Sequence, residues 1–315
     1  KKDKTLYLIV NQYTYNYWAA DDTITPRFMD SADGGTIQEL SIDNILYFPR
    51  KTGSNYLLIA ALDVTQPDES ANIQAFLGSG SQVYMSNEAV YVAAQDYNTI
   101  WGSITNVAKF KVNGTKIAFA GGGMVEGTIL NQFSMEEHEG NLRISTTNWQ
   151  QESINAVYIL DKDLNQIGAL ENLAPGERIF STRFMGDYGY MVTFRQVDPL
   201  FVLDLSDPAK PRVTGELKIP GFSSYLHPIS DKVLLGIGRD VDENTGSQNG
   251  IKLSLFDVSD LGKPRELDTL VLGGPGSYAE VLDNHKALML NLSDDMIAFD
   301  ASLTDITDKF VKTSF

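Results

Sequence analysis

Short apolar runs of strand-forming residues alternate with turn-forming residues along most of the chain. The stretch from Phe201 to Gly221 shows the pattern, with strands at Phe201–Leu203 and Val213–Ile219 separated by the turn residues Asp204–Pro208. Asp and Ser side chains bond their own backbone in turns, and Pro fixes φ and removes a donor. Two strands joined so tightly predict an antiparallel hairpin.

The same hairpin pattern returns at a nearly constant interval. A polar residue closes the first strand of each unit, at spacings of 43 to 53 residues: Asp63, Asn113, Asp161, Asp204, Asp257 and Asp300. A glycine follows the second strand, 14 to 17 residues later: Gly78, Gly127, Gly176, Gly221 and Gly273. Two markers that stay in phase over five units indicate a structural repeat.

Each repeat continues with two more strands, such as Phe222–Ile229 and Val233–Gly238 around the turn at Ser230–Lys232. Four short strands in ~45 residues is the size of a propeller blade. A β-solenoid has shorter rungs, and a β-sandwich need not keep phase. We therefore predict an all-β fold, a β-propeller of four-stranded antiparallel blades, with six blades in this chain.

The two ends of the chain are predicted to meet. Thr5–Val10 resembles the fourth strand of a repeat, and only about one hairpin follows Asp300. A blade shared by both ends would close the ring, and a longer parent chain would make it part of a seven- or eight-bladed propeller. We interpret residues 1–315 as a single propeller domain that lacks N-terminal residues of its parent, with residues 12–50 as an irregular loop or cap insertion.

Charge and composition restrict the partners. The 315 residues carry a net charge of −16 and no cysteine. Coulomb repulsion opposes binding to nucleic acid or anionic membranes, and the lack of cysteine excludes disulfides and thiolate metal sites. No apolar run is long enough for a membrane span, so we expect no membrane insertion. The acidic, cysteine-free composition is typical of an exported bacterial protein, and we expect a secreted or cell-surface monomer.

Several longer motifs resemble a known family. They are Ile24–Gly35, Leu130–Thr147, Leu173–Pro208, Glu216–Pro228 and Gly250–Leu267. They are similar to secreted bacterial and archaeal proteins that carry a β-propeller distantly related to WD-repeats. The resemblance implies export, a propeller fold and no established enzymatic activity. It draws attention to the Arg, Gln and His positions within the motifs without assigning them roles.

Four polar residues inside these motifs are candidate ligand contacts. Arg183 and Arg195 fall on the third and fourth strands of one repeat, Gln132 lies in the repeat before, and His227 lies in the repeat after. Arginines on the strands of an acidic protein pair with carboxylates between blades, or they line the axial channel and receive an anionic or sugar ligand.

Aromatic residues near the N-terminus give a second candidate surface. Tyr15 and Trp18 lie in a tyrosine-rich stretch at the start of the insertion. Their rings would stack on a sugar or a partner, or they would pack the insertion onto the propeller face.

The sequence holds little sign of catalysis or metal binding. Its three histidines lie in different repeats, and no GxSxG motif is present, so no catalytic residues are assigned. Asp240, Asp242 and Asn244 place oxygen ligands at alternate positions of a loop, which suits calcium. The alternative is a solvated acidic loop.

Rigid propellers carry specificity on their exposed loops. The sequence therefore favours an extracellular binding or scaffold module that recognises a protein or a glycan through its loop face. Two alternatives remain open. One is a propeller hydrolase or lyase with its site at the mouth of the axial channel, and the other is a purely structural domain of a longer surface protein.

Overall fold

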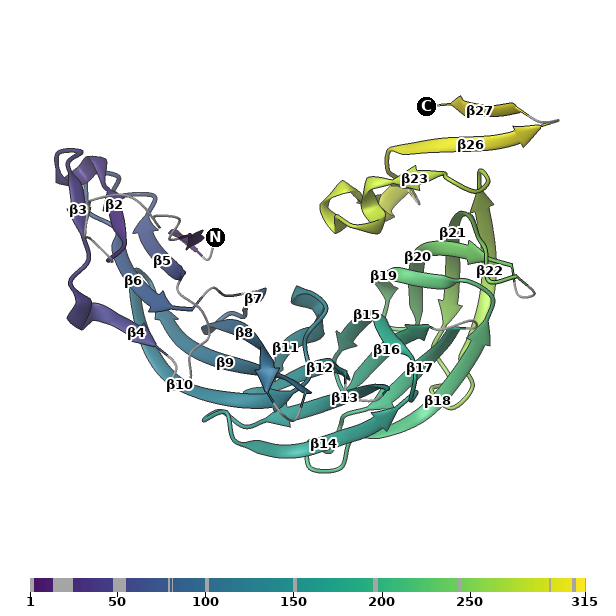
Figure 1. The fold of residues 1–315 in the computed structure, drawn as a ribbon, viewed down its shortest axis with the longest axis horizontal. Helices are drawn as coiled ribbons and strands as arrows, with labels where there is room; N and C mark the ends of the chain where they lie inside the picture. The colour runs from purple at the N-terminus through teal and green to yellow at the C-terminus, as the bar shows by residue number, and fades with distance from the viewer. Residues whose placement is uncertain are drawn as a thin grey trace. The chain divides into compact units, whose positions relative to one another are not determined.

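The structure is a computed structural model, drawn in Figure 1. It describes residues 3–13, 25–47, 55–78, 80, 82–99, 102–149, 152–194, 198–242, 245–294, 296–307 and 310–314. Within these ranges the chain consists of β-strands, with only short 3-10 turns between some of them. No helix among the described residues has the length and apolar character needed to cross a bilayer.

The chain divides into two compact units. The first contains Lys1–Gln132 with Glu139–Leu142 and Leu160–Asn165, and the second contains Phe133–His138, Arg143–Ile159 and Gln166–Phe315.

The first unit holds two four-stranded sheets. One has the order β1-β5-β6-β4, formed by β1 (Thr5–Gln12), β5 (Tyr56–Asp63), β6 (Asn72–Leu77) and β4 (Ile45–Tyr47), of which only β4 and β6 are parallel neighbours. The other has the order β10-β9-β8-β7, formed by β7 (Gln82–Met85), β8 (Ala89–Thr99), β9 (Gly102–Asn113) and β10 (Lys116–Glu126).

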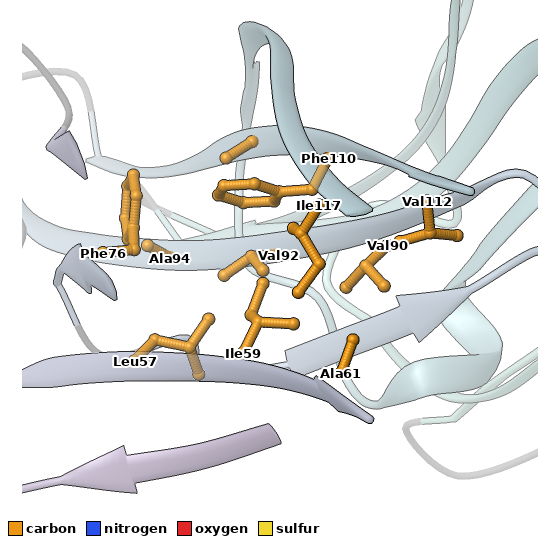
Figure 2. Packing of buried hydrophobic residues seen from close by; sticks show 11 residues of the cluster. Leu57, Ile59, Ala61, Phe76, Val90, Val92, Ala94, Phe110, Val112 and Ile117 are labelled. Carbon is orange, nitrogen blue, oxygen red and sulfur yellow. The ribbon is translucent and has the colours of Figure 1, made fainter. Parts of the chain in front are cut away.

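The core of the first unit fills the space between these two sheets. Alternate residues of β5, β8 and β9 point inward, because successive side chains of a strand face opposite sides of the sheet. Figure 2 shows the resulting cluster, whose larger members are Leu57, Ile59, Phe76, Val90, Val92 and Phe110. The rings of Phe76 and Phe110 meet edge to face, with centroids 6.1 Å apart, a favourable geometry for aromatic pairs.

The described part of the segment between β1 and β5 carries short elements of its own. Strands β2 (Arg27–Met29) and β3 (Ile37–Glu39) pair around the 3-10 turn η1 (Ser31–Asp33), and η2 (Ile42–Asn44) precedes β4. The Asp30 side chain accepts hydrogen bonds from the backbone amides of Ala32 at 3.0 Å and Ala71 at 2.8 Å. Asp30 therefore fastens this segment to the turn before β6.

The second unit holds three four-stranded antiparallel sheets in chain order. The first is β11 (Met135–His138), β12 (Asn141–Trp149), β13 (Ser153–Leu160) and β14 (Gln166–Leu173). The second is β15 (Arg178–Met185), β16 (Tyr188–Phe194), β17 (Asp198–Asp204) and β18 (Arg212–Ile219). The third is β19 (Phe222–Ser230), β20 (Val233–Val241), β21 (Gln248–Asp257) and β22 (Arg265–Leu272).

The last part of the chain is less regular. Strands β23 (Tyr278–Ala279), β26 (Ala301–Thr307) and β27 (Phe310–Ser314) form a three-stranded sheet, and β24 (Met289–Asn291) pairs with β25 (Met296–Ala298). Three 3-10 turns lie between these strands: η4 (Glu280–Leu282), η5 (His285–Ala287) and η6 (Leu292–Asp294). The five four-stranded sheets and the three-stranded sheet at the end of the chain confirm the all-β propeller with six blades in this chain.

The boundaries between blades differ from the predicted ones. The repeat read from the sequence groups the last two strands of one sheet with the first two of the next, so it is offset by two strands. Arg183 therefore lies on β15, the first strand of its sheet and not the third. The offset arises because β16 pairs with β17 within one sheet. In contrast, β18 and β19, which lie on either side of the marker glycine Gly221, belong to different sheets.

The proposed pairing between the two ends of the chain stays a prediction. Among the described residues, β1 pairs with β5, whereas β26 pairs with β23 and β27. The predicted similarity of Thr5–Val10 to the fourth strand of a repeat is confirmed. Strand β1 pairs with the strand that ends at Asp63, just as β16 pairs with the strand that ends at Asp204.

Both sequence markers have a structural cause. The marker aspartates accept hydrogen bonds from the backbone amide two residues on, in the turn between the third and fourth strands: Asp63, Asp161, Asp204 and Asp257. The marker glycines all have positive φ, from 65° to 124°, and they end the fourth strands: Gly78, Gly127, Gly176, Gly221 and Gly273. Only glycine adopts this conformation without strain.

The Asp257 turn predicts a specific dependence of stability on pH. Hydrogen bonds from Ser259 and then from Arg265 lower the pKa of Asp257 to about 2. Because the folded pKa lies below the unfolded one, this contribution is present above about pH 4. It is lost as the pH falls towards 2. We expect Asp257→Asn to lower the melting temperature slightly at pH 7 and to flatten its fall between pH 4 and pH 2.

Melting curves at several pH values test this expectation, with Asp231→Asn in an exposed turn as the control. An Asp257→Asn variant that keeps the acid sensitivity of the wild type would show that the turn makes no such contribution.

A third repeated feature brings consecutive sheets close together. Glycines on fourth strands lie against the turn between the third and fourth strands of the following sheet: Gly123 against Leu164, Gly168 against Pro208, and Gly215 against Leu261. A Cβ atom at Gly123 would lie 2.6 Å from the Leu164 carbonyl oxygen. The absence of a side chain is therefore what allows the sheets to pack this closely.

Candidate ligand-binding site

Five side chains of the second unit gather where its sheets begin. They are Phe133, Arg183, Tyr225, His227 and His285, and we call them the histidine–arginine cluster. Phe133 lies in the 3-10 turn η3 (Gln132–Ser134), which leads into β11, whereas Arg183 lies on β15. Tyr225 and His227 lie on β19, and His285 begins η5. Residues 152 positions apart in the sequence thus form one group.

Local packing holds these elements in place. Strands β15 and β19, the first strands of neighbouring sheets, contact one another, as Figure 1 shows. Ser224, next to Tyr225 on β19, donates a hydrogen bond to the Leu282 carbonyl at 3.2 Å. This bond fixes the segment from η4 to η5 against β19, and with it the position of His285.

Ring contacts organise the cluster. The Phe133 ring lies edge to face with His285 at a centroid distance of 4.8 Å and lies 5.5 Å from the Tyr225 ring. The Arg183 guanidinium carbon lies 4.8 Å from the centre of the Phe133 ring, a distance typical of cation–π attraction. The Tyr225 hydroxyl is hydrogen-bonded to Nδ1 of His227 at 2.8 Å.

Both histidines of the cluster are held in the neutral form. Burial lowers the pKa of His227, and the positive charge of Arg183 lowers it further. Burial also lowers the pKa of His285, with smaller contributions from Lys286 and Arg183. Since an unperturbed imidazole already titrates near 6.5, both rings are neutral at pH 7. A neutral imidazole carries one N–H donor and one acceptor nitrogen, and in His227 the Nδ1 atom is the one that contacts the Tyr225 hydroxyl.

The N–H groups of the Arg183 guanidinium are not used within the described part of the chain. Among the residues described, this guanidinium donates no hydrogen bond and lies in no ion pair, and it lies over the Phe133 ring. A guanidinium carries N–H donors in a planar fork that matches a carboxylate. A half-buried arginine with unused donors is therefore available to a ligand.

Arg143 shows what a structural arginine looks like in this fold. Its buried guanidinium contacts the Glu136 carboxylate at 3.3 Å and donates to the Gly186 carbonyl in the next sheet. His138 makes a similar link between sheets, with its Nε2 atom 3.2 Å from the Asp187 carboxylate. Pairing between blades, which the sequence allowed for the arginines, therefore applies to Arg143 and not to Arg183.

Glu136 is the carboxylate whose charge Arg183 influences. Burial raises its pKa, and the charges of Arg143, His138 and Arg183 act in the opposite direction. Its hydrogen bond goes to Arg143. The Glu136 charge is thus balanced by another arginine.

The structure brings together part of the predicted ligand set. Arg183 and His227 lie in the cluster, and Gln132 begins the 3-10 turn that carries Phe133. Arg195, Tyr15 and Trp18 lie outside the described residues.

Three members of the cluster were missed by the sequence analysis. Tyr225 was predictable, because residues two apart on a strand share a face and His227 was already a candidate. Phe133 and His285 gave no such signal, since each lies in a turn whose position depends on packing.

The proposed calcium loop uses its carboxylates within the protein. Asp240 accepts a hydrogen bond from the Asn249 side chain at 3.0 Å, and Asp242 accepts from the amide and hydroxyl of Thr245 at 2.8 and 3.0 Å. Asn244 lies outside the described residues. Across the residues described, no group of three or more His, Asp or Glu side chains could hold a metal ion.

Calcium binding at this loop stays a prediction from the sequence, and the hydrogen bonds of Asp240 and Asp242 favour the alternative, a turn-forming role. We expect the melting temperature to be the same in calcium and in EDTA, for the wild type and for Asp240→Ala alike. A rise with calcium that Asp240→Ala removes would instead establish the metal site.

The comparison with known families agrees with this architecture. Residues 1–314 match the Beta propeller domain family, and the chain belongs to that family.

Two archaeal relatives have similar sequences. An uncharacterised protein of Archaeoglobus fulgidus is 45% identical over 188 residues, which are 59% of this chain and 28% of that protein. An uncharacterised protein of Methanocaldococcus jannaschii is 46% identical over 168 residues, 52% of this chain and 26% of that protein. The matched part of the chain thus spans about a quarter of the length of these relatives.

Two solved structures share the fold at low identity. The periplasmic gluconolactonase of Pseudomonas aeruginosa superposes with a TM-score of 0.50 and 13% identity, over 82% of this chain and 77% of that one. A candidate 6-phosphogluconolactonase of Bacteroides uniformis gives a TM-score of 0.51 and 12% identity, over 82% of this chain and 76% of that one. These similarities concern the fold alone.

Proposed function

We propose that this propeller is a binding module of the cell surface or the extracellular space, and that it recognises a glycan through the histidine–arginine cluster. The observation that carries the proposal is Arg183, whose donors are unused and which lies on an aromatic ring beside two neutral imidazoles. Aromatic rings with a few fixed polar groups are the usual lining of small-molecule sites.

The size of the cluster favours a glycan over a protein partner. A stable protein interface buries on the order of 800 Å² on each side, far more than five side chains provide. A sugar ring needs only a stacking surface and a few hydrogen-bond partners. A protein partner would instead require the surrounding loops to supply most of the contact.

Binding to an array of bacterial and archaeal glycans tests the proposal. We expect the wild type to retain a subset of glycans, His227→Gln to lose them, and His138→Gln to behave as the wild type. His138 is the matched control, because it lies in the same unit but contacts Asp187 and no member of the cluster. Retention of no glycan, or equal losses in both variants, would contradict the proposal.

A second candidate function is catalysis at the same cluster. It is favoured by the contact between the Tyr225 hydroxyl and the neutral His227 ring beside a fixed positive charge, because a neutral imidazole is suited to general acid–base work. Propellers do serve as enzymes, as the Pseudomonas aeruginosa gluconolactonase shows. Incubating the protein with a glycan that it binds distinguishes the two functions, since an enzyme releases new chain ends and a binding module leaves the glycan intact.

A further inference from the structure

Resting on the proposed function, we propose that the ligand of the histidine–arginine cluster is an acidic sugar, whose carboxylate binds the Arg183 guanidinium while its ring lies against Phe133 and His285.

The positive charge of the Arg183 guanidinium favours an anionic ligand. Arginine is charged at all physiological pH values, and its fork binds a carboxylate through two parallel hydrogen bonds. Among the described residues the N–H groups of Arg183 have no hydrogen-bond partner, because the guanidinium lies over the ring of Phe133. That ring also fixes the orientation of the guanidinium before a ligand arrives. The neutral groups of the cluster offer no comparable site for a carboxylate.

The cluster holds one positive charge, which favours a ligand group with one negative charge. His227 and His285 are neutral at pH 7, so Arg183 is the one cation among the five side chains of the cluster. A phosphate monoester carries nearly two negative charges at pH 7, more than one guanidinium balances, whereas a carboxylate carries one. Nε2 of the neutral His227 ring, whose Nδ1 contacts Tyr225, then hydrogen-bonds a hydroxyl group, which a sugar acid has and a simple fatty acid lacks.

The negative charge of the chain does not prevent an acidic ligand from binding to Arg183. A net charge of −16 repels anions at long range, but salt screens such forces beyond about 8 Å at physiological ionic strength. Glu136 is already hydrogen-bonded to Arg143. Binding of an acidic ligand therefore depends on Arg183 itself and not on a broad positive surface.

Calorimetric titration with oligomers of galacturonate and glucuronate tests the inference, with the methyl esters of the same oligomers as neutral probes. We expect the acids to bind at least about ten-fold more tightly than the esters, in line with the strength of a bidentate ionic hydrogen bond. Arg183→Gln should remove this preference, and Arg183→Lys should keep part of it. Arg212→Gln, an exposed arginine paired with Asp204, should behave as the wild type.

Melting curves of each variant confirm that it is folded. Equal affinity for acid and ester, or an unchanged preference in Arg183→Gln, would overturn the inference and leave glycan binding intact. Failure of every acidic oligomer, while neutral glycans bind to the array, would overturn it in the same way. Failure of all glycans would overturn both the inference and the proposed function.

Discussion

Replacing Gly215 with alanine is expected to lower the free energy of unfolding by about 2–3 kcal/mol, the usual range for forcing extra atoms into a packed site. The methyl group would clash with the Leu261 carbonyl and come within 2.9 Å of the Pro264 ring. Both neighbours belong to the turn of the next sheet, and a backbone carbonyl cannot move aside as a flexible side chain can. The two sheets must separate to admit the new atom.

Urea denaturation followed by fluorescence measures the effect. Gly262→Ala is the matched control, because its added atom would have no neighbour closer than 3.6 Å and its backbone has no left-handed φ. We expect this control to change stability by less than about 0.5 kcal/mol. Equal effects of the two substitutions would show that close packing at Gly215 is unimportant.

The second large effect is expected at Asn155, a buried residue that joins two sheets. Its side-chain amide donates to the carbonyls of Leu173 and Glu177, each at 3.1 Å, and its oxygen accepts from Thr147 at 2.7 Å. Thr147 in turn accepts from the amide of Ile179 at 3.2 Å. Asn155→Ala removes this donor from the buried Leu173 carbonyl and the half-buried Glu177 carbonyl, so we expect a loss of about 3 kcal/mol.

A double-mutant cycle with Thr147→Val separates the network from its parts. Because the two side chains share a hydrogen bond, we expect the double variant to be less destabilised than the sum of the single variants. Asn291→Ala, on a short exposed hairpin, is the control. Strict additivity would show that the residues act independently, and a loss below about 1 kcal/mol in Asn155→Ala would contradict the structural role.

Much of the fold could be predicted from local chemistry. The turn at Asp204 and the positive φ of Gly221 are properties of short segments, so their spacing alone revealed the repeat. The grouping of strands into blades was wrong by half a repeat, because it depends on which strands pair over longer distances. Gly168 and Gly215 were missed as a marker, since what they allow is contact with another sheet.

Less of the candidate site than of the fold could be predicted from the sequence. Arg183 and His227 were recognised as interesting, but their proximity depends on how β15 packs against β19. His285 comes from the irregular end of the chain, where no repeat predicts a position. The distinction between Arg183 and Arg143 required the partners of each guanidinium, which no pattern in the sequence specifies.

Histidine-selective NMR tests the central claim, that the cluster is the ligand site, most directly. The chain has only three histidines, two in the cluster and one outside it, so each gives its own imidazole signal. On titration with an acidic oligosaccharide we expect the signals of His227 and His285 to move together and saturate, while the His138 signal stays in place. Assignment through single His→Gln variants identifies each signal. If a ligand binds and the His227 and His285 signals do not move, the site lies elsewhere and the account is wrong.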